Sequence, residues 1–129
     1  MEAAAVSTKI RVLIADDQAL FAETLEALLT TDPRIDVVGS AQDGKEAVRL
    51  WRKLRPDVIL MDISMPVMDG FEATRRIRRN KEDACVLMLT GSNSRIDVDL
   101  ARKSGAAGYV TKDRIAADLI EAIVQVAAR

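Results

Sequence analysis

Short apolar runs alternate along the chain with longer segments in which apolar residues recur every three or four positions. The short runs are typical of buried strands, and the spacing of three or four is typical of amphipathic helices. We therefore predict strands at Ile10–Ala15, Ile35–Ala41, Asp57–Asp62, Cys85–Thr90 and Gly108–Thr111. We predict helices over Asp17–Thr30, Lys45–Leu54, Phe71–Asn80, from a cap at Asn93 or Ser94 to Lys103, and over Arg114–Ala128.

The predicted strands are apolar on both faces, which is typical of a parallel sheet covered by helices on both sides. Five strand–helix units in alternation then form a three-layer α/β domain with right-handed crossovers. The chain has 129 residues, which is the length of one domain. We expect residues 9–129 to form that domain and residues 1–8 to be a disordered tail.

Composition excludes several classes of function. The chain has 19 Lys and Arg residues and 20 Asp and Glu residues, so it has no overall positive charge that would attract nucleic acid. The local run of basic residues at 75–81 is interpreted as the solvated face of a helix. The absence of histidine and the single cysteine exclude Ser-His-Asp triads and Cys/His zinc sites. No apolar stretch approaches the roughly 18 residues of a membrane span. Without a recognisable secretory signal, the chain is expected to be cytoplasmic, with no membrane partner.

The candidate chemistry lies at the carboxyl ends of the strands, where open parallel sheets bind ligands. Asp16 and Asp17 follow the first strand, Asp62 and Thr90 end the third and fourth, and Lys112 follows the fifth. Taken singly, such an Asp usually caps the next helix and such a Lys is usually solvated. At one shared edge, however, they favour a common site.

Electrostatics indicates what that site would bind. Two carboxylates about 5 Å apart repel by roughly 3 kcal/mol at an effective dielectric constant of 20. Three carboxylates therefore call for a bound cation or for a raised pKa on one of them. Oxygen ligands suit Mg²⁺, and Mg²⁺ with a hydroxyl, an amine and a nucleophilic carboxylate makes a phosphoryl-transfer site.

Five segments of the chain resemble the receiver domains of two-component response regulators, most closely those of NarL/LuxR-type transcriptional regulators. The segments are IRVLIADDQALF, IDVVGSAQDGKEAV, PDVILMDISMPVMDGFEATRRIR, VLMLTG and GAAGYVTKD, and they extend from Ile10 to the last helix. The resemblance implies a flavodoxin-like, doubly wound parallel sheet of five strands in the order 2-1-3-4-5.

The resemblance also implies the metal site. Asp62 matches the phosphoacceptor, which also contacts the metal ion. Asp17 matches the direct Mg²⁺ ligand, and Asp16 matches the acid that holds metal-bound water. Ser64 matches the position whose backbone carbonyl completes the metal site.

Three further positions match the machinery that responds to the phosphoryl group. Thr90 matches the hydroxyl that turns toward it, Lys112 the amine that pairs with it, and Tyr109 the aromatic switch that follows Thr90. Most receivers have a proline after this lysine, joined by a cis peptide. Asp113 stands there instead, which leaves the geometry of that bond open.

The implied function is a phosphorylation-activated switch. Asp62 would accept a phosphoryl group from a sensor histidine kinase with Mg²⁺, and the surface of the fourth helix, fifth strand and fifth helix would change. The chain would be a regulator and not an enzyme, apart from its own phosphotransfer and dephosphorylation. It would form a homodimer on phosphorylation and control transcription through an attached DNA-binding domain that is absent from this sequence, with no direct nucleic-acid binding of its own.

Three alternatives remain open. One is a stand-alone receiver that acts through protein contacts. A second is a pseudo-receiver, a binding module that would normally have lost one of four residues: Asp17, Asp62, Thr90 and Lys112, all of which are present. The third is a phosphatase with an aspartyl intermediate, which generally needs a second acid where Ser64 stands.

Overall fold

Five parallel strands form a single sheet in the computed structural model, which describes residues 9–91 and 95–128. The strand order is β2-β1-β3-β4-β5, so the predicted order 2-1-3-4-5 is confirmed. The strands are β1 (Ile10–Ala15), β2 (Ile35–Ala41), β3 (Val58–Asp62), β4 (Val86–Thr90) and β5 (Gly108–Thr111). The helices are α1 (Ala19–Leu29), α2 (Gly44–Leu54), α3 (Gly70–Asn80), α4 (Arg95–Ser104) and α5 (Ile115–Ala127). The predicted tail at residues 1–8 and the predicted cap at Asn93 or Ser94 lie outside the described residues.

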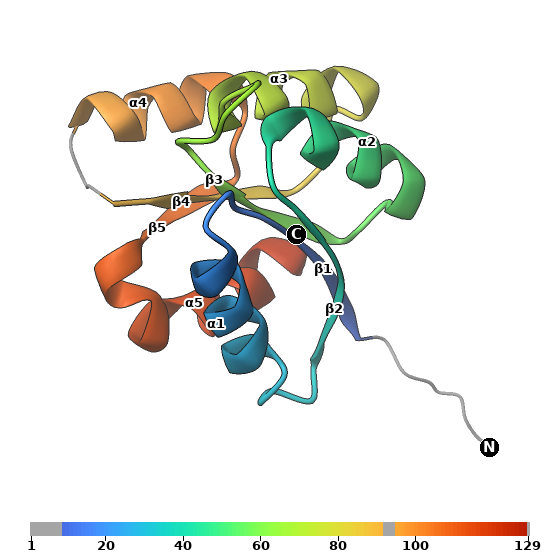
Figure 1. Cartoon of the computed structure of the whole chain (residues 1–129), viewed down its shortest axis with the longest axis vertical. Helices are drawn as coiled ribbons and strands as arrows, with labels where there is room; N and C mark the ends of the chain where they lie inside the picture. The colour runs from blue at the N-terminus through green and yellow to red at the C-terminus, as the bar shows by residue number, and fades with distance from the viewer. Residues whose placement is uncertain (1–8, 92–94, 129) are drawn as a thin grey trace.

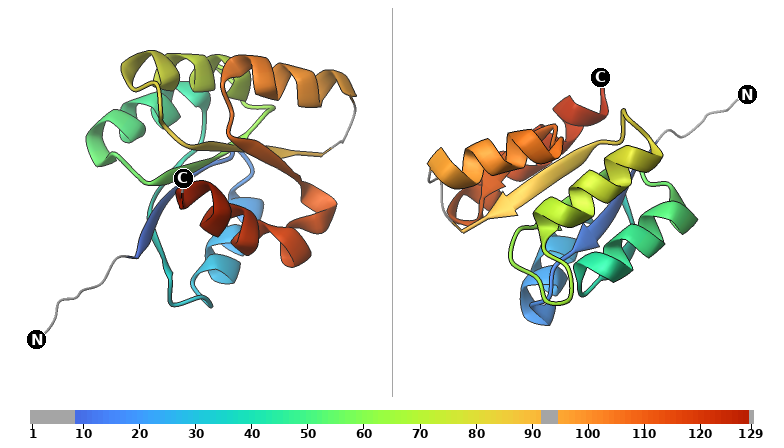
Figure 2. Two further views of the ribbon diagram at one scale, coloured as in Figure 1. Left: turned by 180° about the vertical axis from the view of Figure 1, so that it is seen from behind. Right: turned by 90° about the horizontal axis from the view of Figure 1, so that it is seen from above.

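The helices cover both faces of the sheet. Helices α2, α3 and α4 lie on one face, and α1 and α5 lie on the other (Figures 1 and 2). Each face has its own apolar core, because successive strand residues point to opposite sides. Leu13 packs with Trp51 and Ile77 on the first face, whereas Ile14 packs with Leu29 and Leu119 on the second. The three-layer arrangement predicted from the apolar strands is therefore confirmed, as is the flavodoxin-like fold that the resemblance implies.

The register of the strands brings their carboxyl ends to one edge. Ala15 lies opposite Met61, Asp62 opposite Leu89, and Thr90 opposite Thr111. Because all pairs are parallel, the residues that follow β1, β3 and β5 emerge at the same edge of the sheet, with the end of β4 between those of β3 and β5. This edge is where the candidate residues were expected.

The loop between β3 and α3 is held close to the end of β3. The Gly70 N–H donates to the Ile63 carbonyl at 2.9 Å, and a Cβ on Gly70 would overlap the backbone oxygen of Asp62. On the other side, a Cβ on Gly44 would overlap the backbone oxygen of Met68. The loop therefore lies tightly between the phosphoacceptor candidate and the start of α2.

Helix starts follow side-chain caps. Asp43 and Asp69 accept hydrogen bonds from the backbone N–H groups of Glu46 and Glu72, at 2.7 and 2.9 Å, and so begin α2 and α3. Helix α1 begins two residues later than predicted, because Gln18 is extended and its N–H donates to the Asp16 carboxylate.

No helix within residues 9–91 and 95–128 has the length and apolar character needed to cross a membrane.

The edge strand β2 carries a β-bulge. Val12 of β1 lies opposite Val37, whereas the next residue, Leu13, lies opposite Gly39. Val38 is therefore the extra residue, without a partner in β1. Such a bulge bends and twists the strand locally.

Candidate functional site

Three carboxylates meet at the carboxyl edge of the sheet. Asp16 and Asp17 follow β1 and Asp62 ends β3, and one oxygen of each lies within 4.8 Å of the others. Asp16 and Asp62 are buried, with 1% and 5% of their surfaces exposed, whereas Asp17 is exposed. The acids predicted to cluster are thus brought together, with one of them open to solvent.

One lysine faces the two buried acids. Lys112 follows β5, and its Nζ lies 3.3 Å from Asp62 Oδ1 and 3.5 Å from Asp16 Oδ2. The same Nζ lies 4.4 Å from the ring centre of Phe21 on α1, within range of a cation–π contact. The aromatic ring and the two carboxylates together fix the ammonium group at the site.

Phe21 is the contact that the sequence did not reveal. Its helical spacing indicates a core position or a partner contact near the edge of the sheet, and neither interpretation pairs it with Lys112. Residues 21 and 112 are far apart in sequence and come together only because β5 ends and α1 begins at the same edge of the sheet. No local signal marks such a pair.

Burial and neighbouring charges raise the pKa of the Asp62 carboxyl to about 6. Loss of hydration in the buried position is the largest cause, because it disfavours the charged form. The Asp16 carboxylate adds repulsion, Lys112 partly offsets it, and Asp17 adds a smaller repulsion. The Asp62 carboxyl is therefore ionised less readily than an ordinary aspartate, with a midpoint close to pH 6.

The oxygens of Asp16 already have partners. Oδ1 accepts the Gln18 N–H at 2.8 Å, and Oδ2 faces Lys112. The Asp17 side chain is exposed, and within residues 9–91 and 95–128 no hydrogen bond or ion pair restrains it. Three carboxylates beside one ammonium leave a local excess of negative charge, and the donors are all oxygen. This donor set fits a hard dication such as Mg²⁺.

The other predicted residues take their expected places on the backbone. Thr90 is buried at the end of β4, one residue beyond the partner of Asp62. Tyr109 in β5 is 43% exposed, and its register partner is Met88. Ser64 lies two residues after Asp62 in the β3–α3 loop with its side chain exposed, and its predicted role as a carbonyl ligand stays a prediction. The Lys112–Asp113 peptide is trans.

A family of known proteins matches most of the chain. The model of the response regulator receiver domain matches residues 12–124. This range includes all seven residues assigned to the site: Asp16, Asp17, Asp62, Ser64, Thr90, Tyr109 and Lys112.

Individual relatives agree with this match. The transcriptional regulatory protein DegU of Brevibacillus brevis is 43% identical over 119 residues, covering 92% of this chain and 50% of that protein. The nitrate/nitrite response regulator NarL of Escherichia coli is 36% identical over 117 residues, covering 91% of this chain and 54% of that protein. The chain therefore spans about half the length of these relatives.

A solved structure shares the fold. It is a two-component response regulator of the LuxR family from Aurantimonas sp. SI85-9A1, with a TM-score of 0.89 and 36% identity. The superposition covers 93% of this chain and 86% of that one.

Proposed function

Because this chain belongs to the response regulator receiver domain family, we propose that it is a phosphorylation-activated switch with Asp62 as the phosphoacceptor. The observation that carries the proposal is the contact of Lys112 with Asp62 at 3.3 Å, beside two further carboxylates. An ammonium group in that position can meet a phosphoryl oxygen once the transfer has occurred. A pseudo-receiver has no need of this arrangement.

In the proposed step, an Asp62 carboxylate oxygen attacks the phosphorus of a phosphohistidine in a sensor kinase. A P–O bond forms, the P–N bond breaks, and the electron pair of that bond returns to the imidazole, which takes up a proton. Lys112 offsets charge on the phosphoryl oxygens throughout. The attacking group must be ionised, and a pKa of about 6 leaves it mostly ionised at pH 7.

Mg²⁺ would be held by Asp17, Asp62 and, through water, Asp16, with the Ser64 carbonyl as a further ligand. When bound, it supplies positive charge that stabilises phosphoryl oxygens. The residues of the chain itself fix the geometry. Asp16 is anchored by the Gln18 N–H, and Lys112 is anchored by Phe21.

The conformational response is proposed to pass through Thr90 and Tyr109. A phosphoryl group on Asp62 adds charge and acceptor oxygens that the Thr90 hydroxyl and Lys112 can meet in only one arrangement. Movement of Thr90 would open space for the Tyr109 ring, which is half exposed in this structure. The surface formed by α4, β5 and α5 would change as a result.

The family also supports the proposed partners. The phosphoryl donor would be a sensor histidine kinase in the cytoplasm, and the phosphorylated form would pair with a second copy. NarL, DegU and the LuxR-family structure are named as regulators, which supports an output in transcription control. In this proposal the receiver itself binds no nucleic acid and catalyses only its own phosphotransfer and dephosphorylation.

Incubation with acetyl phosphate and Mg²⁺ tests the proposal. The intact protein should gain one phosphoryl group, labile to both acid and base as an acyl phosphate is. Asp62→Asn should gain none. Asp113→Asn is the matched control, because Asp113 is an exposed acid next to Lys112, and it should be labelled like the unchanged protein. Labelling of Asp62→Asn would refute the assignment of the phosphoacceptor.

A further inference from the structure

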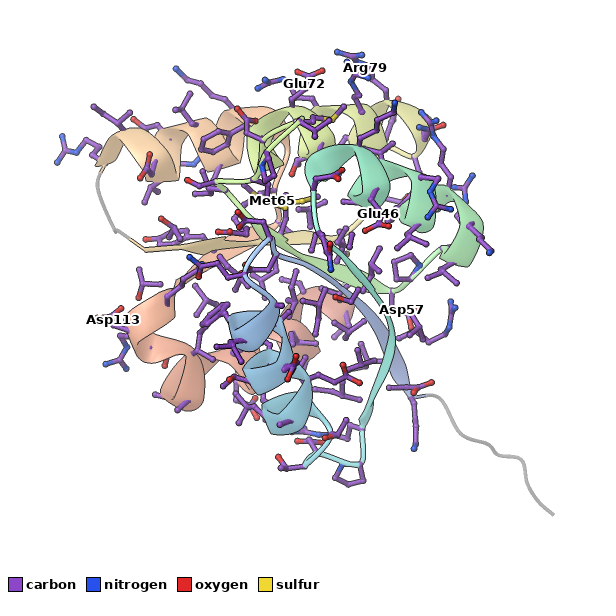
Figure 3. The ribbon with its side chains drawn as sticks, viewed as in Figure 1. Glu46, Asp57, Met65, Glu72, Arg79 and Asp113 are labelled. Carbon is purple, nitrogen blue, oxygen red and sulfur yellow. The ribbon has the colours of Figure 1, made fainter. Side chains whose placement is uncertain are left out.

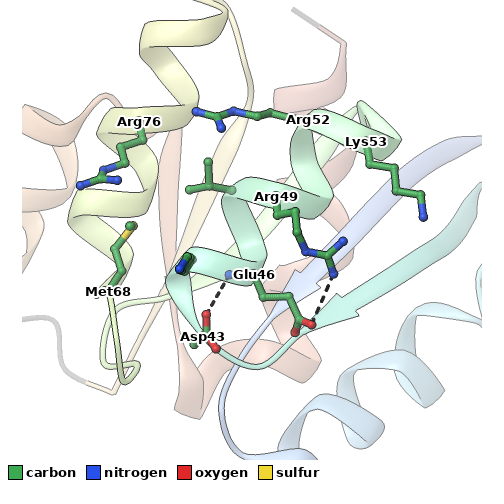
Figure 4. A pocket seen from close by; sticks show the side chains of 9 residues that line it. Asp43, Glu46, Arg49, Arg52, Lys53, Met68 and Arg76 are labelled. Carbon is green, nitrogen blue, oxygen red and sulfur yellow. Dashed lines mark hydrogen bonds and ion pairs between the residues drawn. The ribbon is translucent and has the colours of Figure 1, made fainter.

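A groove of about 710 Å³ runs between α2 and α3, on the face of the sheet away from α1 and α5. Its walls come from Arg49 and Arg52 on α2, Arg76 on α3, and Met68 in the β3–α3 loop (Figure 4). Val48 forms part of its floor. Arg52 extends from α2 across the groove toward α3 (Figure 4).

The two helices that form the groove carry an unusual share of the positive charge. They contain eight of the 19 Lys and Arg residues of the chain and only two of its 20 Asp and Glu residues. Since the whole chain has a net charge of −1, the rest of the surface is acidic. The positive charge is thus concentrated on one side of the molecule.

Local ion pairs leave much of this charge unbalanced. The two acids of these helices are Glu46, which pairs with Arg49 at 3.7 Å, and Glu72, which pairs with Arg75 and Arg76 at 3.0 and 2.9 Å. In the part of the chain that the structure describes, Arg52 and Arg79 form no ion pair. Arg52, Arg76 and Arg79 also line a second hollow of about 320 Å³ that extends the groove toward Asn80. Arg79 projects from α3 away from the sheet (Figure 3).

Helix-end electrostatics explains only part of this pattern. Arg52 and Lys53 lie in the last turn of α2, and Arg78 and Arg79 lie in the last turn of α3, where cations favourably oppose the helix dipole. Arg76, however, lies in the middle of α3, and Arg52 crosses toward the neighbouring helix. Exposed arginines that converge on one groove from two elements are typical of a surface that binds carboxylates or phosphates.

The lining favours a peptide over a nucleic acid. Among the residues lining the groove none is aromatic, so unstacked bases would find no ring to stack on. The apolar part of the floor is instead the half-buried Met68 side chain, the aliphatic stems of the basic residues and the small exposed part of Val48, which is otherwise buried. The lining includes two acids, Asp43 and Glu46, against five basic residues. An apolar floor between two helices, with a rim of arginines, suits an amphipathic helix that carries apolar residues on one face and acidic residues beside them.

We propose that the groove between α2 and α3 is a docking site for an acidic amphipathic segment of a partner protein. The apolar residues of that segment would cover Val48 and Met68, and its carboxylates would meet Arg52, Arg76 and Arg79. None of the residues that line this groove belongs to the seven assigned to the site or to α4, β5 or α5. The inference therefore stands whether or not Asp62 accepts a phosphoryl group.

The test uses a fluorescein-labelled peptide of about 15 residues, with leucines at helical spacing and glutamates elsewhere. Fluorescence anisotropy should show binding at low salt that weakens as the salt concentration rises from roughly 0.05 to 0.5 M. Amide NMR of the unchanged protein should place the shifts at Arg49, Met68 and Arg76. The same peptide with alanine in place of leucine should bind more weakly, because it cannot cover the apolar floor.

Charge reversal identifies the surface. The double variant Arg52→Glu/Arg79→Glu should lose about tenfold or more in affinity. The double variant Arg95→Glu/Lys103→Glu changes the net charge equally but lies on α4, and it should bind nearly as well as the unchanged protein. All four side chains are exposed, so both variants should keep the fold, which circular dichroism would verify.

Four results would overturn the proposal. The first is no binding of the leucine–glutamate peptide at low salt. The second is an equal loss of affinity in the two double variants, which would indicate general charge attraction. The third is amide shifts confined to α4 and β5. The fourth is tighter binding at the same residues by a single-stranded oligonucleotide of about 20 nucleotides, which would make the groove a nucleic-acid surface.

Discussion

Lys112 stands between two buried carboxylates and can neutralise only one of them. The pair distances, 3.3 Å to Asp62 and 3.5 Å to Asp16, are nearly equal, so its charge is shared. Removing the lysine would leave two buried carboxylates without a counter-charge, which usually lowers the unfolding free energy. Removing one of the carboxylates takes away the unbalanced negative charge and should raise the unfolding free energy. At the scale of single residues, the site is therefore a place where function opposes stability.

Replacement of Asp62 by Asn should stabilise the metal-free protein at pH 7. A carboxyl whose pKa is raised to about 6 takes up its proton more readily in the folded state than in the unfolded state, where its pKa is near 3.8. Its contribution to the unfolding free energy is therefore fully present below pH 4 and lost as pH rises to 6. The stability gained by Asp62→Asn should grow across that window and reach about 3 kcal/mol at pH 7, measured by urea unfolding in a chelating buffer.

The pH dependence that other acids add to the unfolding free energy is the same in Asp62→Asn and in the unchanged protein. The Arg34 guanidinium beside Asp32 lowers the pKa of that carboxyl to about 2, so its contribution is lost as pH falls below 4. It is present in both proteins and cancels in the difference. A stability difference that stays constant from pH 4 to pH 7 would contradict the raised pKa of Asp62.

Mg²⁺ should raise the melting temperature of the protein by relieving the repulsion among Asp16, Asp17 and Asp62. At ten times its dissociation constant, a ligand that binds only the folded state adds about 1.4 kcal/mol, which corresponds to a shift of about 4 °C. Differential scanning fluorimetry with Mg²⁺ and with chelator measures this shift. Asp17→Asn should remove most of the shift without harming the fold, because Asp17 is exposed. An unchanged melting temperature in the unsubstituted protein would count against the metal site.

The β3–α3 loop is the element in which backbone packing leaves least room. Gly70→Ala would place a methyl group against the Asp62 backbone oxygen, and the neighbouring groups are backbone atoms that cannot turn aside. We expect a loss of about 1–3 kcal/mol in the unfolding free energy. Gly91→Ala is the matched control, because a Cβ there meets nothing within 4 Å, and it should change stability little. Equal urea midpoints for the two variants would contradict the close approach.

Elements buried on both faces were the easiest to predict. The five strands, the helices between them and the edge that carries Asp16, Asp62 and Lys112 were predictable, because apolar strands and their polar ends leave a strong pattern. The strand order came from the resemblance to receiver domains and not from that pattern. Helix starts were less accessible. The delayed start of α1 depends on a hydrogen bond from the Gln18 N–H to Asp16, which no periodicity records.

Side-chain contacts between distant elements could not be predicted from the pattern. Phe21 and Lys112 meet through the relative placement of α1 and β5. The sequence indicated only a solvated helix face at the basic run 75–81. The convergence of arginines from α2 and α3 on one groove depends on how the two helices pack, which the pattern does not record. The sequence left two ways to accommodate three neighbouring carboxylates, a bound cation or a raised pKa on one of them. The raised pKa of Asp62 could be assigned only once its burial was known.

At the scale of the whole molecule, the switch should require the Thr90 hydroxyl. Beryllofluoride, which mimics a phosphoryl group on Asp62, should shift amide NMR signals from Asp62 through Tyr109 to α4 in the unchanged protein. In Thr90→Ala the shifts should stay near the pocket, because the group that couples the site to Tyr109 is gone. Thr90→Ser is the control and should restore the long-range shifts. Equal long-range shifts in Thr90→Ala would show that the hydroxyl is not the relay.

The bulge at Val38 bears on how the molecule behaves at high concentration. An outer strand offers unpaired backbone groups to any second chain, and a long, straight outer strand invites edge-to-edge growth into aggregates. In β2 the extra residue between Val37 and Gly39 interrupts the regular strand, and the exposed Asp36 adds a negative charge to it. The bulge that interrupts pairing with β1 thus also disfavours edge-to-edge pairing of β2 with a strand of another molecule. Deletion of Val38 would straighten the strand and should make the protein more prone to aggregate.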